Sequence, residues 1–241
     1  WPKPLAKYDD AHGTNAQAWE AANDQATVRW AGHCLGAAMA SILLDQPTPA
    51  AGSGLDKDEL EGLWAELGEK AGIYQWHRID GECPAVEPEA GADDADGWAP
   101  RFHAIFEECL FSDKKALYAN LRSNGGGPDA VWNHGVWKYE ATYKETDGGD
   151  ETIVQVDVVI TANDDHTPPT NDAGVREVEY TYVIQYKADG KPKPDGESDW
   201  ISVGGEATYA PSHVGHPLGA DWGGWNPHVT EVGVKDLDTA N

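Results

Sequence analysis

A cysteine at the start of a predicted helix is the first candidate for chemistry in this sequence. In RWAGHCLGAAMASILL, residues 29 to 44, Cys34 follows Gly32 and His33 and precedes a run of small and apolar residues. A thiolate is the reactive form of cysteine, and the unpaired N–H groups of a helix N-terminus favour it by lowering the thiol pKa. The pattern fits a cysteine nucleophile, and it fits equally a small cysteine buried among alanines in the core.

A catalytic thiol also needs an imidazole within hydrogen-bond reach and a third group that orients the ring. The chain has nine histidines. His33 adjoins Cys34 but leaves the helix start on another side, and His134 lies in WNHGV just before a predicted strand. His103 lies in RFHAIF, with Asn120 following in LYANL. The spacing does not choose among these three bases.

Metal binding has less support in the sequence. His213, His216 and His228 could form a cluster, but no cysteine or carboxylate spacing completes a zinc site around them. The acidic stretches GADDADG (91 to 97) and ANDDH (162 to 166) lack the full spacing of an EF-hand loop. We therefore expect no cofactor and no metal site, with calcium at the acidic loops as the alternative left open.

The charge of the chain restricts its partners. Seventeen basic and 42 acidic residues give a net charge of -25 and a pI of about 4.4, so nucleic acid and anionic membrane surfaces would be repelled. No apolar run approaches the roughly 18 residues that span a bilayer. Because the numbering begins at Trp1 rather than at Met, we expect a processed, secreted protein. We also expect it to act as a monomer.

The periodicity of apolar residues changes along the chain. A helical period marks residues 16 to 22, 31 to 44 and 56 to 67, and it fits residues 101 to 111 better than a strand does. Asp56 and Glu59 have the spacing of a capping box at the start of the third segment. Strict alternation then predicts three long antiparallel strands, at residues 135 to 145, 152 to 162 and 176 to 187.

This order of elements predicts an α+β fold, with a helical N-terminal part packed on an antiparallel β-sheet. We expect one catalytic domain over residues 1 to 241. Its helical part would run to about residue 125, its β-rich part over about 126 to 210, and an irregular tail over 204 to 241. Residues 81 to 100, rich in Gly, Pro and Asp, are predicted to form a loop.

Several segments, taken in order, resemble the elicitor-type transglutaminases of oomycetes and marine bacteria. RWAGHCLGAAMASILL resembles the segment around that family's catalytic cysteine, IDGEC (79 to 83) its Gly-x-x-Cys segment, and RFHAIF its Phe-His segment. AVWNHGVWKYEATY (130 to 143) resembles its Val-Trp-Asn-Gln-Pro-Val-x-x-Tyr strand. YTYVIQYKADG (180 to 190), DGESDW (195 to 200) and SHVGHP (212 to 217) follow in the family's order. The resemblance spans about residues 19 to 222.

The resemblance implies a papain-like transglutaminase core with Cys34 as nucleophile and His103 as general base. Asn120 would orient the ring of His103 where the family usually has Asp, and Asp113 is the nearest acidic substitute. His134 stands where the family has Gln, which keeps it as an alternative base.

Other positions take their roles from the same resemblance. The indole N–H of Trp30, with Gln25 behind it, would help the backbone N–H of Cys34 to stabilise the oxyanion. The family's second cysteine in the loop before Phe-His is absent, so Cys83 would pair with Cys109 or stay unpaired.

The reaction that the resemblance implies is transfer of an acyl group from a protein glutamine carboxamide to lysine or another primary amine. The partners would then be proteins bearing glutamine and lysine. Two enzymatic alternatives use the same residues, namely a protein-glutamine deamidase, with water as acceptor, and a papain-like cysteine peptidase. The non-catalytic alternative is a secreted elicitor or binding protein, with the WGGW segment (222 to 225) as its binding surface.

Overall fold

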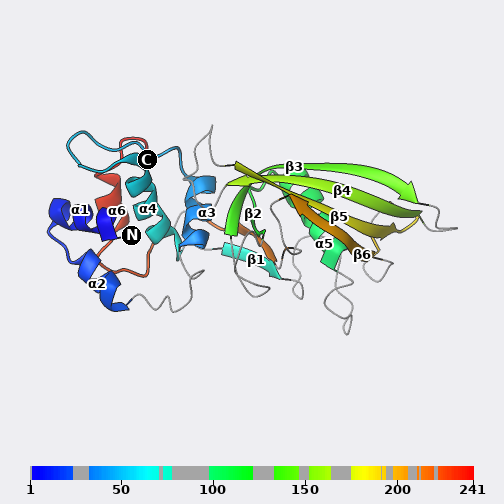
Figure 1. Cartoon of the computed structure of the whole chain (residues 1–241), viewed down its shortest axis with the longest axis horizontal. Helices are drawn as coiled ribbons and strands as arrows, with labels where there is room; N and C mark the ends of the chain where they lie inside the picture. Colours follow the sequence, from blue (N-terminus) through cyan, green and yellow to red (C-terminus); the bar gives the residue numbers. More distant parts are fainter. Residues whose placement is uncertain are drawn as a thin grey trace.

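The chain divides into a group of helices at one end and a β-sheet at the other (Figure 1). The computed structural model describes residues 2–23, 33–70, 73–77, 98–121, 133–146, 152–163, 175–190, 192–193, 198–205, 211, 213–219 and 222–241. Helices and an antiparallel sheet are both present, which confirms the predicted α+β class. Among the described helices, none combines the length and the apolar character needed to cross a bilayer.

The sheet has seven strands in the order β1-β7-β2-β3-β4-β5-β6, and every neighbouring pair is antiparallel. Their bounds are β1 (Ile73–His77), β2 (Tyr118–Asn120), β3 (Asn133–Thr146), β4 (Thr152–Asn163), β5 (Val175–Tyr186), β6 (Ser198–Gly205) and β7 (His213–Pro217). The long strands β3, β4 and β5 confirm the three strands predicted from alternation.

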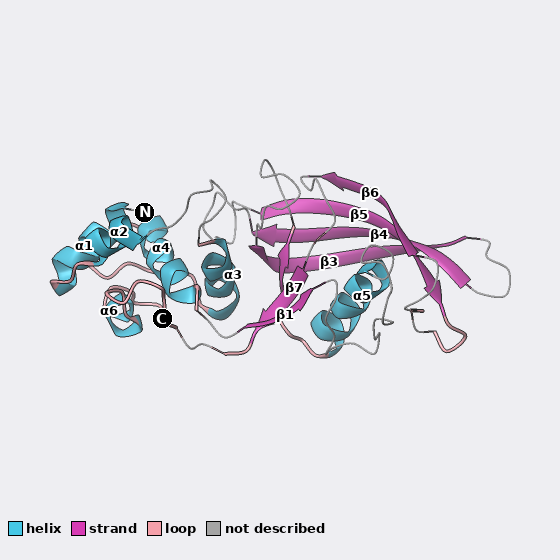
Figure 2. Cartoon of the chain, turned by 90° about the horizontal axis from the view of Figure 1, so that it is seen from below, coloured by secondary structure: helices cyan, strands magenta, loops and turns pink. Residues whose placement is uncertain are grey.

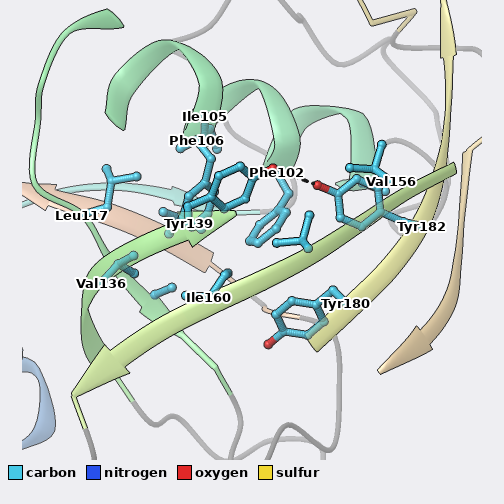
Figure 3. Close-up of a cluster of buried hydrophobic side chains, with 14 of the residues drawn as sticks. Phe102, Ile105, Phe106, Leu117, Val136, Tyr139, Val156, Ile160, Tyr180 and Tyr182 are labelled. Atoms are coloured by element: carbon cyan, nitrogen blue, oxygen red, sulfur yellow. Dashed lines mark hydrogen bonds between the residues drawn. The ribbon is translucent and has the colours of Figure 1, made fainter. Parts of the chain in front are cut away.

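One face of the long strands forms the larger core. Every second side chain on β4 and β5 is buried, which gives the set Val154, Val156, Val158, Ile160, Ala162, Val178, Tyr180, Tyr182 and Ile184. Helix α5 (Trp98–Ile105) and the π-helical segment η1 (Phe106–Ser112) cover this face (Figures 2 and 3). The ring of Phe102 meets those of Tyr180 and Tyr182 edge-on, at centroid distances of 6.0 and 6.1 Å. The helical period predicted for residues 101 to 111 is confirmed.

The helices at the other end enclose a second core. They are α1 (Pro2–His12), α2 (Ala16–Asn23), α4 (Lys57–Gly68) and α6 (Glu231–Lys235), packed around buried residues that include Leu5, Tyr8 and Trp64. The indole N–H of Trp64 donates to the Asp238 carboxylate over 2.8 Å, which ties the C-terminal segment to α4. The predicted capping box is confirmed, since Asp56 and Glu59 each accept the other's backbone N–H.

Helix α3 (Cys34–Leu43) contributes to the second core and lies with α4 on one side and β3 on the other (Figure 1). At Gly36 and Gly68 the backbones of α3 and α4 come into direct contact. A Cβ atom on Gly36 would lie 1.8 Å from the carbonyl oxygen of Ala65, and one on Gly68 would lie 2.5 Å from the carbonyl oxygen of Gly36. The small residues after Cys34 therefore serve close helix packing.

The structure corrects the predicted division into a helical part, a β-rich part and an irregular tail. Strands β1 and β2 fall in the part expected to be helical, and β7 and α6 fall in the expected tail. These strands have three to five residues, too few for a period of two to stand out. They exist because β7 pairs with both β1 and β2, partners far away in the sequence.

Candidate active site

Cys34 lies at the first position of α3 and faces the beginning of β3. The side-chain amide nitrogen of Asn133, the first residue of β3, is 3.6 Å from Cys34 Sγ and donates to it. The amide oxygen of the same residue is 2.8 Å from Nε2 of His213, the first residue of β7. A thiol, an amide and an imidazole therefore meet at one place.

The sheet topology explains how these distant residues come together. β7 and β3 are both antiparallel to β2, which lies between them, so β7 and β3 run in the same direction. Their first residues, His213 and Asn133, consequently lie at the same end of the sheet. Helix α3 packs against β3 and places Cys34 at this end.

The amide of Asn133 also determines which nitrogen of His213 is basic. Because the amide nitrogen is turned toward Cys34 Sγ, the amide oxygen faces His213, and an amide oxygen can only accept a hydrogen bond. Nε2 must then carry the proton in the neutral ring, which leaves the lone pair on Nδ1. Holding the imidazole in one neutral tautomer is one task of the third member of a Cys-His-Asn triad.

The thiol of Cys34 is not activated by its position alone. Burial raises the pKa of Cys34 above its ordinary value, and the nearby carboxylate of Glu69 raises it further. The N–H groups of Asn133 and the backbone N–H of Leu35 lower the pKa, but burial outweighs them. The start of the helix thus lowers this pKa as expected, through the N–H of Leu35, but the net pKa is raised, and the thiol needs a base to become nucleophilic.

His103 does not lie beside Cys34. It is 2% exposed on α5, against the core face of the sheet, whereas α3 lies at the end of the sheet (Figures 1 and 2). Its Nδ1 is 3.0 Å from the hydroxyl oxygens of both Tyr139 and Tyr182, and its Nε2 is 3.2 Å from that of Tyr186 and 3.5 Å from that of Tyr143. This ring of tyrosines corrects the pairing of His103 with Cys34, because both ring nitrogens are engaged inside the core.

The burial of His103 predicts a loss of stability in acid. Burial lowers the pKa of His103 to about 4, so the folded protein keeps the ring neutral while an unfolded chain protonates it near pH 6.5. The stabilisation is complete above pH 6.5 and is lost as the pH falls through about 4, with a total of about 3 kcal/mol. Urea unfolding from pH 7.5 to pH 4 should show this slope in the wild type and not in His103→Gln. Parallel curves for the two proteins would contradict it.

The remaining predicted base and orienting residues lie as follows. Asn120 is fully buried at the end of β2 and is paired in register with Asn133, so it belongs to the row of residues at the Cys34 site rather than to the surroundings of His103. His134 is buried and follows Asn133 on the strand, so its side chain points to the opposite face. Asp113 is 48% exposed after η1 and lies 3.1 Å from Lys115, so it is not an orienting group.

Other predicted positions lie outside the described residues. These are Trp30, Gln25, Cys83 and the acidic loop at residues 91 to 97. Cys109 is described and is fully buried in the core of the sheet. Its pairing with Cys83 stays a prediction, as does the oxyanion role of Trp30.

The sequence patterns indicated His213 only as a possible member of a histidine cluster, with no metal site expected there, and did not predict its contact with Asn133. His213 and His216 are three residues apart on β7, so their side chains point to opposite faces. The only signals for His213 were the segments WNHGV and SHVGHP, both of which take part in the family resemblance. Neither segment indicates that β7 and β3 begin at the same end of one sheet.

The fold of this chain is similar to that of a solved structure, although its sequence matches no known family. No protein-family model matches the chain, and no curated protein sequence matches it significantly. Among solved structures, the chain is similar to the GP42 transglutaminase from Phytophthora sojae, with a TM-score of 0.66 and 14% sequence identity. The likeness covers 96% of this chain and 80% of the other. The chain therefore has a transglutaminase-like α+β fold, as the resemblance of its segments predicts.

Proposed function

We propose that this chain is a cysteine acyltransferase that moves the acyl group of a protein glutamine to lysine or another primary amine. The observation that carries the proposal is the contact of Asn133 with both Cys34 Sγ and His213 Nε2. The transglutaminase-like fold supports it. In this proposal His213 replaces His103 as the base, and Asn133 takes the orienting role first assigned to Asn120.

The first half of the reaction forms a thioester. Nδ1 of His213 takes the thiol proton of Cys34, and the thiolate attacks the carbon of the glutamine carboxamide. The backbone N–H of Cys34 at the helix start is suited to stabilise the oxyanion of the tetrahedral intermediate. As the C–N bond breaks, the imidazolium of His213 returns its proton to the leaving nitrogen, and ammonia departs.

The second half transfers the acyl group. A lysine amine attacks the thioester carbon while His213 Nδ1 takes a proton from the amine nitrogen. The C–S bond then breaks to release the isopeptide, and the imidazolium of His213 returns its proton to the leaving sulfur, which restores the thiol of Cys34. Asn133 keeps Nε2 of His213 protonated throughout, and its amide N–H faces the sulfur on which negative charge develops. The net charge of -25 favours cationic, lysine-bearing acceptors. We further propose that the enzyme is secreted, monomeric and built as one catalytic domain.

An assay that follows amine incorporation and ammonia release together tests this proposal. The wild type, given a glutamine-bearing peptide and a fluorescent primary amine, should show both signals, and Cys34→Ala should lose both by at least about a thousandfold because no thioester can form. Ser41→Ala, seven residues after Cys34 on the same helix, is the matched control and should retain both signals, since the Ser41 hydroxyl donates to Ala38 O within α3.

The other outcomes separate the alternatives. Ammonia without amine incorporation would identify a deamidase. Cleavage of the peptide backbone without either signal would identify a peptidase. No Cys34-dependent product of any kind, together with a thiol that iodoacetamide does not alkylate, would contradict the catalytic proposal and leave a binding protein.

A further inference from the structure

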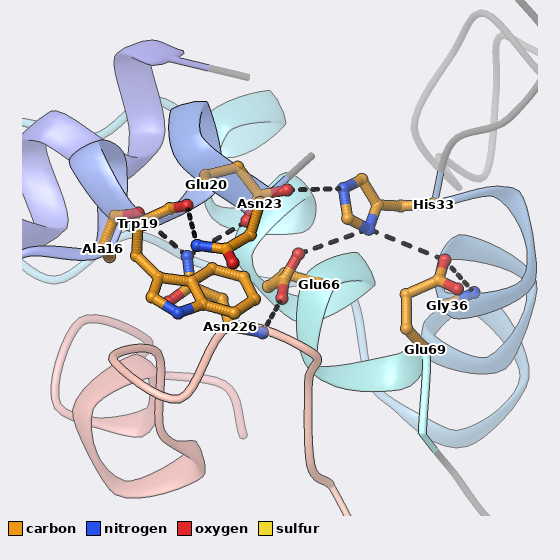
Figure 4. A network of polar contacts seen from close by, with 9 residues as sticks. All are labelled: Ala16, Trp19, Glu20, Asn23, His33, Gly36, Glu66, Glu69 and Asn226. Atoms are coloured by element: carbon orange, nitrogen blue, oxygen red, sulfur yellow. Dashed lines mark hydrogen bonds and ion pairs between the residues drawn. The ribbon is translucent and has the colours of Figure 1, made fainter. Parts of the chain in front are cut away.

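A second polar cluster lies immediately before Cys34, where three helices meet (Figure 4). His33 is the N-cap residue of α3, and its ring projects between Glu20 of α2 and Glu66 of α4. Its Nδ1 is 3.3 Å from Glu66 Oε2, and its Nε2 is 3.9 Å from Glu20 Oε1. Glu69, one helical turn after Glu66, brings Oε1 to 3.6 Å from Nδ1. This cluster takes no part in the proposed acyl transfer.

Asn226 holds both carboxylates in place. Its backbone N–H donates to Glu66 Oε1 over 2.8 Å, and its side-chain amide donates to Glu20 Oε2 over 3.1 Å. Asn226 is itself 1% exposed and donates to the carbonyl of Ala16 as well. In each carboxylate, one oxygen thus accepts a hydrogen bond from Asn226. The other oxygen, Oε2 of Glu66 or Oε1 of Glu20, faces His33. Outer groups that orient ligands in this way are a regular feature of metal sites.

Glu66 is the member of the cluster whose position calls for a ligand. Its side chain is 1% exposed, and its Oε2 is buried and has no hydrogen-bond partner among the described residues. The oxygen has His33 Nδ1 at an ion-pair distance of 3.3 Å but no hydrogen bond. A buried carboxylate oxygen without a hydrogen bond is costly, and the carboxylate of Glu20 adds negative charge that Lys70 offsets only in part. A cation between Glu66 and His33 would give Glu66 Oε2 a partner and would offset the negative charge of the two carboxylates.

We propose that His33, Glu66 and Glu20 form a Zn²⁺ site, with Glu69 available for the fourth position. One ligand atom from each of the first three lies within 4.8 Å of the others. Two ligands of a tetrahedral zinc ion with bonds of about 2.0 Å are about 3.3 Å apart. The distance of 3.3 Å from His33 Nδ1 to Glu66 Oε2 meets this requirement. Glu20 Oε1 lies 3.9 Å from the other ring nitrogen, Nε2, so the Glu20 side chain would move toward the Nδ1 side to bind the same ion.

The donor set favours zinc over calcium. Imidazole nitrogen is a good ligand for zinc, whereas calcium takes six to eight oxygens. The bound ion would join α2 and α4 to the residue that precedes Cys34. Its expected effect is therefore on the stability of the helical end and on the position at which α3 begins, independently of whether Cys34 transfers acyl groups.

Titration of metal-stripped protein with Zn²⁺ tests the site directly. We expect one equivalent to bind the wild type with a dissociation constant in the micromolar range or tighter, measured by competition with a chromophoric chelator. At a hundredfold excess over that constant, the thermal midpoint should rise by about 5 °C or more. Mn²⁺ and Ca²⁺ are titrated in parallel and are expected to bind more weakly. Preference for Ca²⁺ would overturn the assignment to zinc.

Two variants show whether the cluster is the site. Glu66→Gln keeps an oxygen for Asn226 and can place its amide nitrogen toward His33, so it should fold and should bind Zn²⁺ at least tenfold more weakly. Glu20→Gln, on another helix, should weaken binding as well. The matched control is Glu61→Gln, a carboxylate of α4 with 7% side-chain exposure that lies outside the cluster. Equal zinc affinity in the wild type and Glu66→Gln, or absence of binding to the wild type, would overturn the proposal.

Discussion

Replacing His213 by glutamine is expected to lower kcat for amine incorporation by about a thousandfold or more and to leave the fold intact. The loss follows because Nδ1 of His213 is the proposed acceptor of the Cys34 proton and burial keeps that thiol neutral. The fold should survive because the amide nitrogen of glutamine can donate to Asn133 Oδ1, as Nε2 of His213 does over 2.8 Å. KM should change little, because the proposed role of His213 is proton transfer rather than substrate binding.

His216→Gln is the matched control for His213→Gln. It lies on the same strand, three residues later, and its Nδ1 lies 2.9 Å from the carbonyl oxygen of Pro217, so its loss should leave kcat within about twofold. His103→Gln should likewise keep the reaction under conditions in which it stays folded. The opposite pattern, with full activity in His213→Gln and a thousandfold loss in folded His103→Gln, would return the role of base to His103.

Gly36→Ala is expected to cost about 3 kcal/mol or more of unfolding free energy. Its new Cβ would lie 1.8 Å from the carbonyl oxygen of Ala65, a backbone atom inside α4 that no side-chain rotation can move away. The two helices must separate, and any shift of α3 between α4 and β3 would change the position of Cys34 relative to Asn133. Urea unfolding should therefore show a lower midpoint, and amine incorporation should fall in the fraction that stays folded.

Gly219→Ala provides the comparison for Gly36→Ala. Nothing lies within 4 Å of the Cβ that it would add, so its unfolding free energy should stay within about 0.5 kcal/mol of the wild type. Gly68→Ala, whose Cβ would lie 2.5 Å from the carbonyl oxygen of Gly36, should behave like Gly36→Ala. Wild-type stability in both Gly36→Ala and Gly68→Ala would mean that α3 and α4 can move apart at no cost.

Local patterns in the sequence predicted the long elements and the start of the helix that carries Cys34. The alternation of Val and Tyr predicted β4 and β5, because every second residue of such a strand faces the core. The Asp56 and Glu59 spacing predicted the start of α4, because a capping box is made within four residues. Gly32 and the small residues after it predicted a helix starting at Cys34, where α3 begins.

Which histidine lies near Cys34 depends on tertiary contacts that no local sequence pattern predicts. His103 lies in a segment like that of a catalytic histidine, yet the tertiary structure surrounds it with four tyrosine hydroxyls on the core face of the sheet. His213 meets Asn133 only because β7 is inserted beside β2, so two strands from distant parts of the chain begin side by side. The His33 cluster depends in the same way on three helices and on Asn226.

The sequence by itself thus determined the α+β class, the long strands, the capped helix and the position of the thiol, because each depends on neighbours within one or two turns of chain. Only the tertiary structure decided which imidazole and which amide accompany Cys34, and whether the thiol is activated. Burial, a property of the whole fold, outweighs the helix terminus and raises the pKa of Cys34. Strand order, set by pairing between distant segments, selects His213 and Asn133.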